Sequence, residues 1–159
     1  MSSRHVLRPG AVAGADRTAL LAAHRTYASE FGWPVALNGD SVDLFLDGAV
    51  RAVEVRAGFA CEVAGLLWAS APLGPVLSLP GESKLLWVFL VAPDGDGVGP
   101  AVPPGVRLLS SRHTVPLPPS RVRGGEVGWV NRPDPAQPRL PGLRTVFTAA
   151  RVAQRPHRW

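Results

Sequence analysis

Residues 105–129, GVRLLSSRHTVPLPPSRVRGGEVGW, decide the fold, because short apolar runs alternate there with turn residues. Short strands are expected near residues 106–109, 114–117 and 126–130. The glycine pair at 124–125 predicts a tight turn ahead of the third of these strands. The stretch therefore predicts a domain of short strands joined by loops and turns.

The rest of the chain repeats this alternation of apolar segments and breaks. Apolar residues at helical spacing predict a helix over residues 17–31, with Asp16 as its N-cap. The continuous apolar run at residues 85–91 predicts a central strand that is buried on both faces. The other expected elements are two helices, 58–70 and 143–152, and four strands, 33–37, 42–46, 50–55 and 75–79. We therefore expect an α+β (mixed α/β) fold, a single domain with a mostly antiparallel sheet and flanking helices.

The expected helix over residues 58–70 is rich in apolar side chains. Those expected on its buried side are Phe59, Val63, Leu66 and Leu67. Cys61 is expected in the core as a small hydrophobic residue. Because it is the only cysteine, no intramolecular disulfide can form, and a reducing cytoplasm is the expected compartment. No apolar run approaches the ~20 residues that span a bilayer, so no membrane association is expected.

Length and composition bound the domain organisation. The chain has 159 residues, of which 46% are hydrophobic, so it can build one folded domain. We expect a flexible N-terminus over residues 1–15, a single domain over residues 16–153 and a basic tail over residues 154–159.

Positive charge is concentrated in the later part of the chain. Residues 1–102 carry seven basic and ten acidic side chains, a net of −3, whereas residues 103–159 carry ten arginines and two acids, a net of +8. A basic segment on a near-neutral domain is typical of contact with phosphate backbones. The alternative is coding bias. Lys84 is the only lysine among the 17 basic residues, as expected of a bacterium with a GC-rich genome.

Four motifs resemble those of the primase-polymerase family, the N-terminal domain of bifunctional DNA primase/polymerases in bacterial and plasmid replication. The motif GWPV at 32–35 is similar to the opening of the family, and VEVRAG at 53–58 is similar to its strand with two aspartates. The motif SKLLW at 83–87 resembles its strand with a basic residue and a histidine. Residues 105–120 fit its last motif without a gap, including Pro-Pro-Ser at the end. The resemblance covers roughly residues 20–130 and implies a primase-polymerase-like fold.

The residues that this resemblance assigns to catalysis are replaced. The metal-binding acids of the family fall on Glu54, Arg56 and Arg107, and its triphosphate-binding histidine falls on Leu85. Nucleotidyl transfer of this kind uses two divalent ions that are held by carboxylates. Two permanently charged guanidinium groups would repel such ions. We therefore expect a degenerate member of the family, a pseudoenzyme with no polymerase activity, no bound metal and no cofactor.

The same substitutions suit a nucleic-acid-binding surface. Arg56 and Arg107 would contact phosphate directly in the cleft that once held the ions, and Lys84 matches the basic residue of the family. The alternative is that the two arginines pair with Glu54 as a structural charge cluster. Further residues are expected at the nucleic-acid surface: Arg112, His113, Ser120, Arg121 and Arg123. Basic residues near an aromatic, here Trp129, are typical of a single-strand platform; the alternative is a solvated loop.

Together these observations favour a cytoplasmic protein that binds single-stranded or primer-template DNA, or a replication-related protein partner. A first alternative is a protein-interaction module without nucleic-acid binding, whose contact surface would be Pro-rich loops and exposed tryptophans. A second alternative is an active nucleotidyl transferase with displaced carboxylates, for which the candidates are Asp40, Asp43 and Asp47.

Overall fold

The computed structural model describes residues 16–70, 73–95, 101–109 and 111–156. The N-terminal segment expected to be flexible, 1–15, and the end of the basic tail, 157–159, lie outside the described residues. The described residues form three helices, α1 (Arg17–Glu30), α2 (Ala57–Ser70) and α3 (Leu143–Ala153). Their strands are β1 (Val35–Asn38), β2 (Ser41–Phe45), β3 (Arg51–Arg56), β4 (Val76–Pro80), β5 (Leu85–Val91), β6 (Val106–Leu108), β7 (Thr114–Leu117), β8 (Arg121–Val122), β9 (Gly125–Glu126) and β10 (Gly128–Asn131).

Two antiparallel sheets and a short hairpin organise the chain. The larger sheet has the order β10-β4-β5-β3-β6, the smaller has the order β1-β2-β7, and β8 pairs with β9. All pairings within these sheets are antiparallel. The expected α+β class with a mostly antiparallel sheet is thus confirmed. Strand β5 lies at the centre of the larger sheet, as its continuous apolar run predicts.

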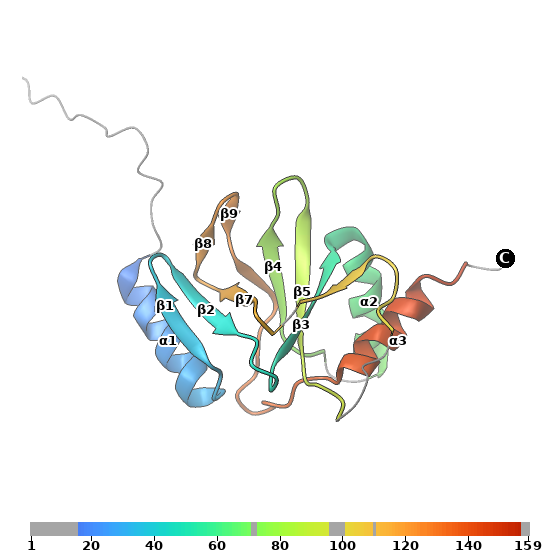
Figure 1. Ribbon diagram of the computed structural model, residues 1–159, viewed down its shortest axis with the longest axis horizontal. Helices are drawn as coiled ribbons and strands as arrows, with labels where there is room; N and C mark the ends of the chain where they lie inside the picture. Colours follow the sequence, from blue (N-terminus) through green and yellow to red (C-terminus); the bar gives the residue numbers. More distant parts are fainter. Residues whose placement is uncertain (1–15, 71–72, 96–100, 110, 157–159) are drawn as a thin grey trace, which may run out of the picture.

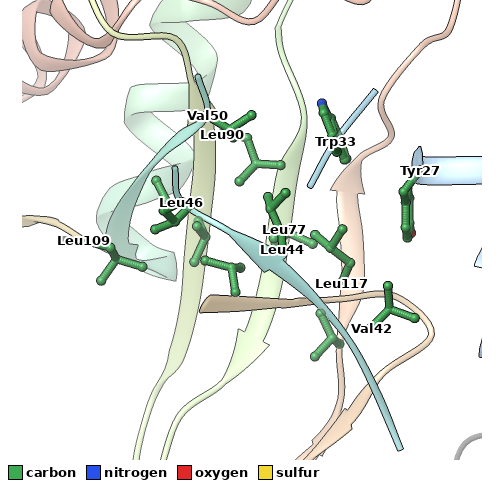
Figure 2. Close-up of a cluster of buried hydrophobic side chains, with 14 of the residues drawn as sticks. Tyr27, Trp33, Val42, Leu44, Leu46, Val50, Leu77, Leu90, Leu109 and Leu117 are labelled. Carbon is green, nitrogen blue, oxygen red and sulfur yellow. The ribbon is translucent and has the colours of Figure 1, made fainter. Parts of the chain in front are cut away.

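The larger sheet separates two hydrophobic clusters. In Figure 1, α2 and α3 cover one side of this sheet, and α1 with β1, β2 and β7 lies on the other side. Along β5 the side chains alternate between the two layers, so that Val88 and Leu90 join the cluster beside the smaller sheet, whereas Phe89 and Val91 join the cluster beneath the helices. Figure 2 shows the first cluster, in which Leu44 of β2 gathers with Leu77 of β4 and Leu90.

Helix α2 differs from expectation at two positions. Its buried residues are Ala60, Val63, Ala64 and Leu67. Cys61 is exposed rather than in the core, and Leu66 is 37% exposed rather than on the buried side. Each residue of a helix is rotated by about 100° from the one before it. Cys61 and Leu66 are each next in sequence to a buried residue, so their side chains point away from the buried face. Part of an apolar helix therefore faces outward.

The expected strand over residues 126–130 is divided in two. Its first residue belongs to β9 of the short hairpin, and β10 joins the edge of the larger sheet next to β4. Val127 lies between them and is buried. The turn of the hairpin contains Gly124 and Gly125, with φ of 106° and 148°. These angles are ones that L side chains rarely adopt, which accounts for the glycine pair. Within the part of the chain that the structure describes, none of the helices has the length and apolar character needed to cross a membrane.

Candidate nucleic-acid interface

One end of the larger sheet brings together the three positions that were expected to have replaced metal-binding acids. Glu54 and Arg56 lie two residues apart in β3 and so share a face of the strand. Arg107 of β6 stands directly opposite Glu54 in the register of these two strands. The Nη1 atom of Arg107 lies 3.8 Å from Oε1 of Glu54, and their side chains are 63% and 20% exposed. This end of the sheet therefore carries one carboxylate and two guanidinium groups on a single face.

Only one of these two arginines has an acidic partner among the described residues. Arg107 pairs with Glu54, as the alternative of a charge cluster predicts. Arg56 is exposed and has no ion-pair partner within 4.0 Å in the described part of the chain. Both arginines line a surface hollow of about 580 Å³. Other residues that line it are Phe59 of α2, Leu86, Gly105 and Gln154. A charged group in this hollow would meet a net positive surface.

Leu85 does not face this hollow. It follows the alternation of β5, which places it on the same side as Trp87 and Phe89, toward the helices. The residue opposite Arg56 in the register is Leu86. Leu85 and Leu86 therefore lie on opposite faces of β5, because a shift of one along a strand moves a side chain to the other face. The correspondence of Leu85 to the triphosphate-binding histidine stays a prediction, and Leu86 lines the hollow without having been expected there.

Two hairpin tips stand beside this end of the sheet. Lys84 lies in the turn between β4 and β5, where Gly81 donates a hydrogen bond to its carbonyl at 2.9 Å. A Cβ atom on Gly81 would lie 2.3 Å from this carbonyl, so the tight turn requires glycine. At the tip of the β8–β9 hairpin, a Cβ atom on Gly124 would lie 3.5 Å from Pro80, so the two hairpins are in contact. Figure 1 shows both tips at the same end of the molecule.

The β8–β9 hairpin contributes two further arginines near this end. Arg123 is exposed in its turn. Arg121 is also exposed, and its Nη2 lies 4.0 Å from Oε2 of Glu126 across the hairpin. This pair is exposed, and its atoms are at the greatest distance at which an ion pair is counted. It therefore adds little to stability and leaves Arg121 available to an anion.

The expected basic group around Trp129 is divided by the fold. Arg112 and His113 are exposed just before β7, whose first residue Thr114 pairs with Phe45 at one end of β2. Arg121 lies at the opposite end of β2, where its backbone N–H donates to the carbonyl of Asp40 at 3.3 Å. Because β7 is extended, it separates the two groups by roughly 13 Å or more. The expectation of a single platform is therefore wrong, and only the pair in the β8–β9 hairpin lies near the hollow.

Ser120 is the expected contact residue that the structure places out of reach. Its side chain is 0% exposed. Its hydroxyl accepts a hydrogen bond from the backbone N–H of Val42 at 2.8 Å. The Pro-Pro-Ser motif thus anchors the chain after β7 to β2, and Ser120 has a structural role that its buried position imposes. The sequence gives no signal of this burial, because serine is usually exposed.

The candidate displaced carboxylates do not converge. Asp43 accepts hydrogen bonds from Ser41 and Asn38 beside the turn between β1 and β2, and Asp47 accepts one from the N–H of Ala49 at 3.2 Å. Asp40 is exposed in the turn. No group of three or more His, Cys, Asp or Glu side chains that could hold a metal ion occurs among the described residues. This finding gives no support to the alternative of displaced carboxylates.

A search of family models, of curated proteins and of solved structures finds no match to this chain.

Proposed function

We propose that this protein is a degenerate relative of the primase-polymerase family that binds DNA through its phosphates and does not transfer nucleotides. The observation that carries the proposal is the single face shared by Glu54, Arg56 and Arg107 at the end of the larger sheet. Where the resemblance implies carboxylates around divalent ions, two guanidinium groups stand instead. Guanidinium groups bind phosphate oxygens directly, by hydrogen bonds that carry charge.

The surroundings of this face support the same proposal. Lys84 and Arg123 stand on hairpin tips in contact with each other at the same end of the molecule. A backbone with regularly spaced phosphates would contact cations of the sheet and of the hairpins together. Single-stranded DNA, or the strand junction of a primer-template, is flexible enough to follow such a path.

The test is the anisotropy of labelled single-stranded and primer-template DNA over a series of salt concentrations. We expect binding that weakens steeply with salt, because released counterions drive it. The variants Arg56→Ala/Arg107→Ala and Arg121→Ala/Arg123→Ala should each lower the salt slope by about 1.4, since each contact with a single-strand phosphate contributes about 0.7. The matched control is Arg17→Ala/Arg25→Ala, which removes two exposed arginines of α1.

A second variant separates phosphate binding from a purely structural charge cluster. Glu54→Gln removes the acid that pairs with Arg107 and leaves both arginines in place. If Arg107 contacts phosphate, DNA affinity should rise, because the guanidinium no longer has a competing anion. If the arginines serve only to pair with Glu54, the variant should lose stability and gain no affinity. Absence of DNA binding by the native protein at the lowest salt would refute the proposal.

A protein-interaction module is the second candidate, and one observation favours it. Trp68 of α2 is 72% exposed, and it lines a hollow of about 910 Å³ together with the Pro-rich connector around Pro138. A large exposed aromatic side chain at a concave surface is typical of protein contacts. This candidate predicts that Trp68 fluorescence, isolated by comparison with Trp68→Phe, stays unchanged on addition of DNA. A change in that signal would argue against a separate protein surface there.

A further inference from the structure

Helix α2 is apolar around its whole circumference. In its sequence, AGFACEVAGLLWAS, only Glu62 and Ser70 carry polar groups on their side chains apart from the thiol of Cys61 and the indole N–H of Trp68. Helices of this kind are usually buried on all sides. Here one stripe packs on the larger sheet, and the outward side, which includes Gly65 and Leu66, is exposed. The composition of α2 is therefore typical of a helix that packs against a further element on its outward side, in addition to the sheet and α3.

A groove follows the seam between α2 and α3. Two hollows of about 420 Å³ and 680 Å³ lie along it, and both are lined by Leu66 of α2 and Val152 of α3. These two side chains are 37% and 39% exposed. The two hollows therefore adjoin at these apolar side chains along the seam. Arg144 at the start of α3 lines one hollow, and Arg155 just after the end of α3 lines the other.

The α3 side of this groove is basic at its two ends. Arg144 and Arg155 are exposed, line the two hollows and lie eleven residues apart, so they are about 20° from each other around the helix. Arg151 lines neither hollow, and its Nη2 donates a hydrogen bond to the carbonyl of Ala101. Helix α3 itself has no acidic residue. On the α2 side, Glu62 is the only carboxylate among the described residues that line either hollow. The groove therefore has Leu66 and Val152 at its middle and an arginine at each end.

We propose that this groove binds an acidic amphipathic helix of a protein partner. The rise of 1.5 Å per residue makes the stretch from Arg144 to Arg155 roughly 16 Å long, which matches about three turns of a bound helix. Apolar residues of the partner, spaced i, i+4 and i+7, would cover Leu66 and Val152. Its acidic residues would face the arginines of α3, and the small residue Gly65 would allow a close approach. The inference goes beyond DNA binding and uses neither Arg56 nor Arg107.

A second copy of this chain is a weaker candidate for the occupant. A two-fold interface would place the same face on both sides. The groove is lined by two arginines and one glutamate, so self-association would bring two surfaces of net positive charge together across a largely desolvated interface. An acidic partner instead complements the charge of the groove.

The experiment uses the full-length protein and a labelled synthetic helix of about sixteen residues, with leucines at i, i+4, i+7 and i+11 and glutamates beside them. A second peptide carries lysines in place of the glutamates and keeps the leucines. We expect the glutamate peptide to bind at least tenfold more tightly than the lysine peptide, as measured by anisotropy. Amide shifts in a nuclear magnetic resonance titration should be confined to α2 and α3.

Variants of the groove test its location. Leu66→Glu should lower the affinity for the glutamate peptide at least tenfold. Arg144→Glu/Arg155→Glu should reverse the preference, so that the lysine peptide binds more tightly than the glutamate peptide. The matched controls are Leu21→Glu and Arg17→Glu/Arg25→Glu, which change exposed residues of the same types on α1, outside the groove. Circular dichroism and thermal melting check that each variant folds. DNA binding should be unchanged in Leu66→Glu, which separates this inference from the proposed function.

Three outcomes would overturn the inference: equal binding of both peptides, no binding of either, or a preference that survives Arg144→Glu/Arg155→Glu. A dimer in sedimentation velocity that Leu66→Glu dissociates would assign the groove to a second copy instead.

Discussion

Tyr27 is the only tyrosine of the chain, and its hydroxyl joins three distant segments. It donates a hydrogen bond to the carbonyl of Pro118 at 2.6 Å and accepts one from Nε1 of Trp129 at 3.2 Å. Its ring stacks on Trp33, with the centroids 5.7 Å apart. Helix α1, the Pro-Pro-Ser motif and the edge of the larger sheet thus meet at one side chain.

This environment predicts how stability depends on alkaline pH. Burial raises the pKa of Tyr27 above its ordinary value of 10.0, and the Trp129 hydrogen bond and the charge of Arg132 oppose this shift. Because the folded protein holds the phenol proton more tightly than the unfolded chain, the contribution is complete below pH ~10 and is lost as the pH rises above it. Tyrosinate absorbance should therefore titrate at higher pH in the folded protein than in urea. Equal titration in the two states would contradict this prediction.

Substitution of Ser120 should lower the stability of the fold and leave DNA binding unchanged. Ser120→Ala removes the hydroxyl that accepts from the N–H of Val42, and it leaves that buried donor without its partner. The free energy of unfolding should fall by about 1–3 kcal/mol. Urea denaturation should show a lower midpoint with an unchanged slope, while the salt dependence of DNA binding stays the same. Ser83→Ala, in the exposed β4–β5 turn, is the control and should change neither.

At the scale of the elements, helix α3 begins without a cap of its own. Its N-cap residue is Gly142, which offers no side-chain hydrogen bond. The carboxylate of Asp94 instead accepts a hydrogen bond from the backbone N–H of Arg144. An acid at this end of a helix also faces the positive end of its dipole. A residue from the loop after β5 thus replaces the local cap.

Removal of this cap should weaken α3 in particular. We expect Asp94→Ala to lower the free energy of unfolding by about 1 kcal/mol and Asp94→Asn to lower it less, since asparagine also caps well. Urea denaturation followed by circular dichroism measures the difference. The control is Asp134→Ala, because Asp134 caps only a surface turn, at the N–H of Ala136. Equal effects of the two alanine variants would show that Asp94 does not serve as a cap.

The elements were largely predictable because their signals are local. Asp16 accepts a hydrogen bond from the N–H of Thr18, as its position before the apolar spacing of α1 predicts. The apolar run of β5 predicted its central place in the sheet. The cap by Asp94 was not predictable, because that residue lies 50 positions before Arg144. Contacts of this range depend on tertiary packing, which leaves no periodic pattern in the sequence.

At the scale of the whole molecule, the two proposed surfaces adjoin at the end of α3, where Gln154 lines the hollow beside Arg56 and Arg155 lines the groove. Glu54, Arg56 and Arg107 were predicted to share a site, and alternation along β3 with the register against β6 places them on one face. Leu86 rather than Leu85 lines the hollow beside them, and the sequence did not predict this because a short apolar run does not fix which residues of a strand share a face. The apolar groove between α2 and α3 was missed, because the sequence of α2 resembles that of a fully buried helix.

The shared face also predicts that a metal site can be built there by substitution. In Arg56→Asp/Arg107→Asp, three carboxylates would stand on adjoining strands, with those at 54 and 107 roughly 5 Å apart at Cβ. Such a cluster should bind Mn²⁺ with a dissociation constant on the order of 10⁻⁴–10⁻³ M, because hard cations prefer carboxylate oxygens. Calorimetry should detect this binding in the variant and not in the native protein, where two guanidinium groups repel the ion.

The control variant has side chains of the same size as aspartate but without charge. Arg56→Asn/Arg107→Asn relieves the same repulsion and supplies no new carboxylate, so Glu54 alone would remain to hold the ion. The aspartate variant should lose stability without metal, because three like charges lie close together, and Mn²⁺ should restore its melting temperature. Mn²⁺ should leave the melting temperature of the asparagine variant unchanged. Equal responses of the two variants would mean that these three positions do not converge on one ion.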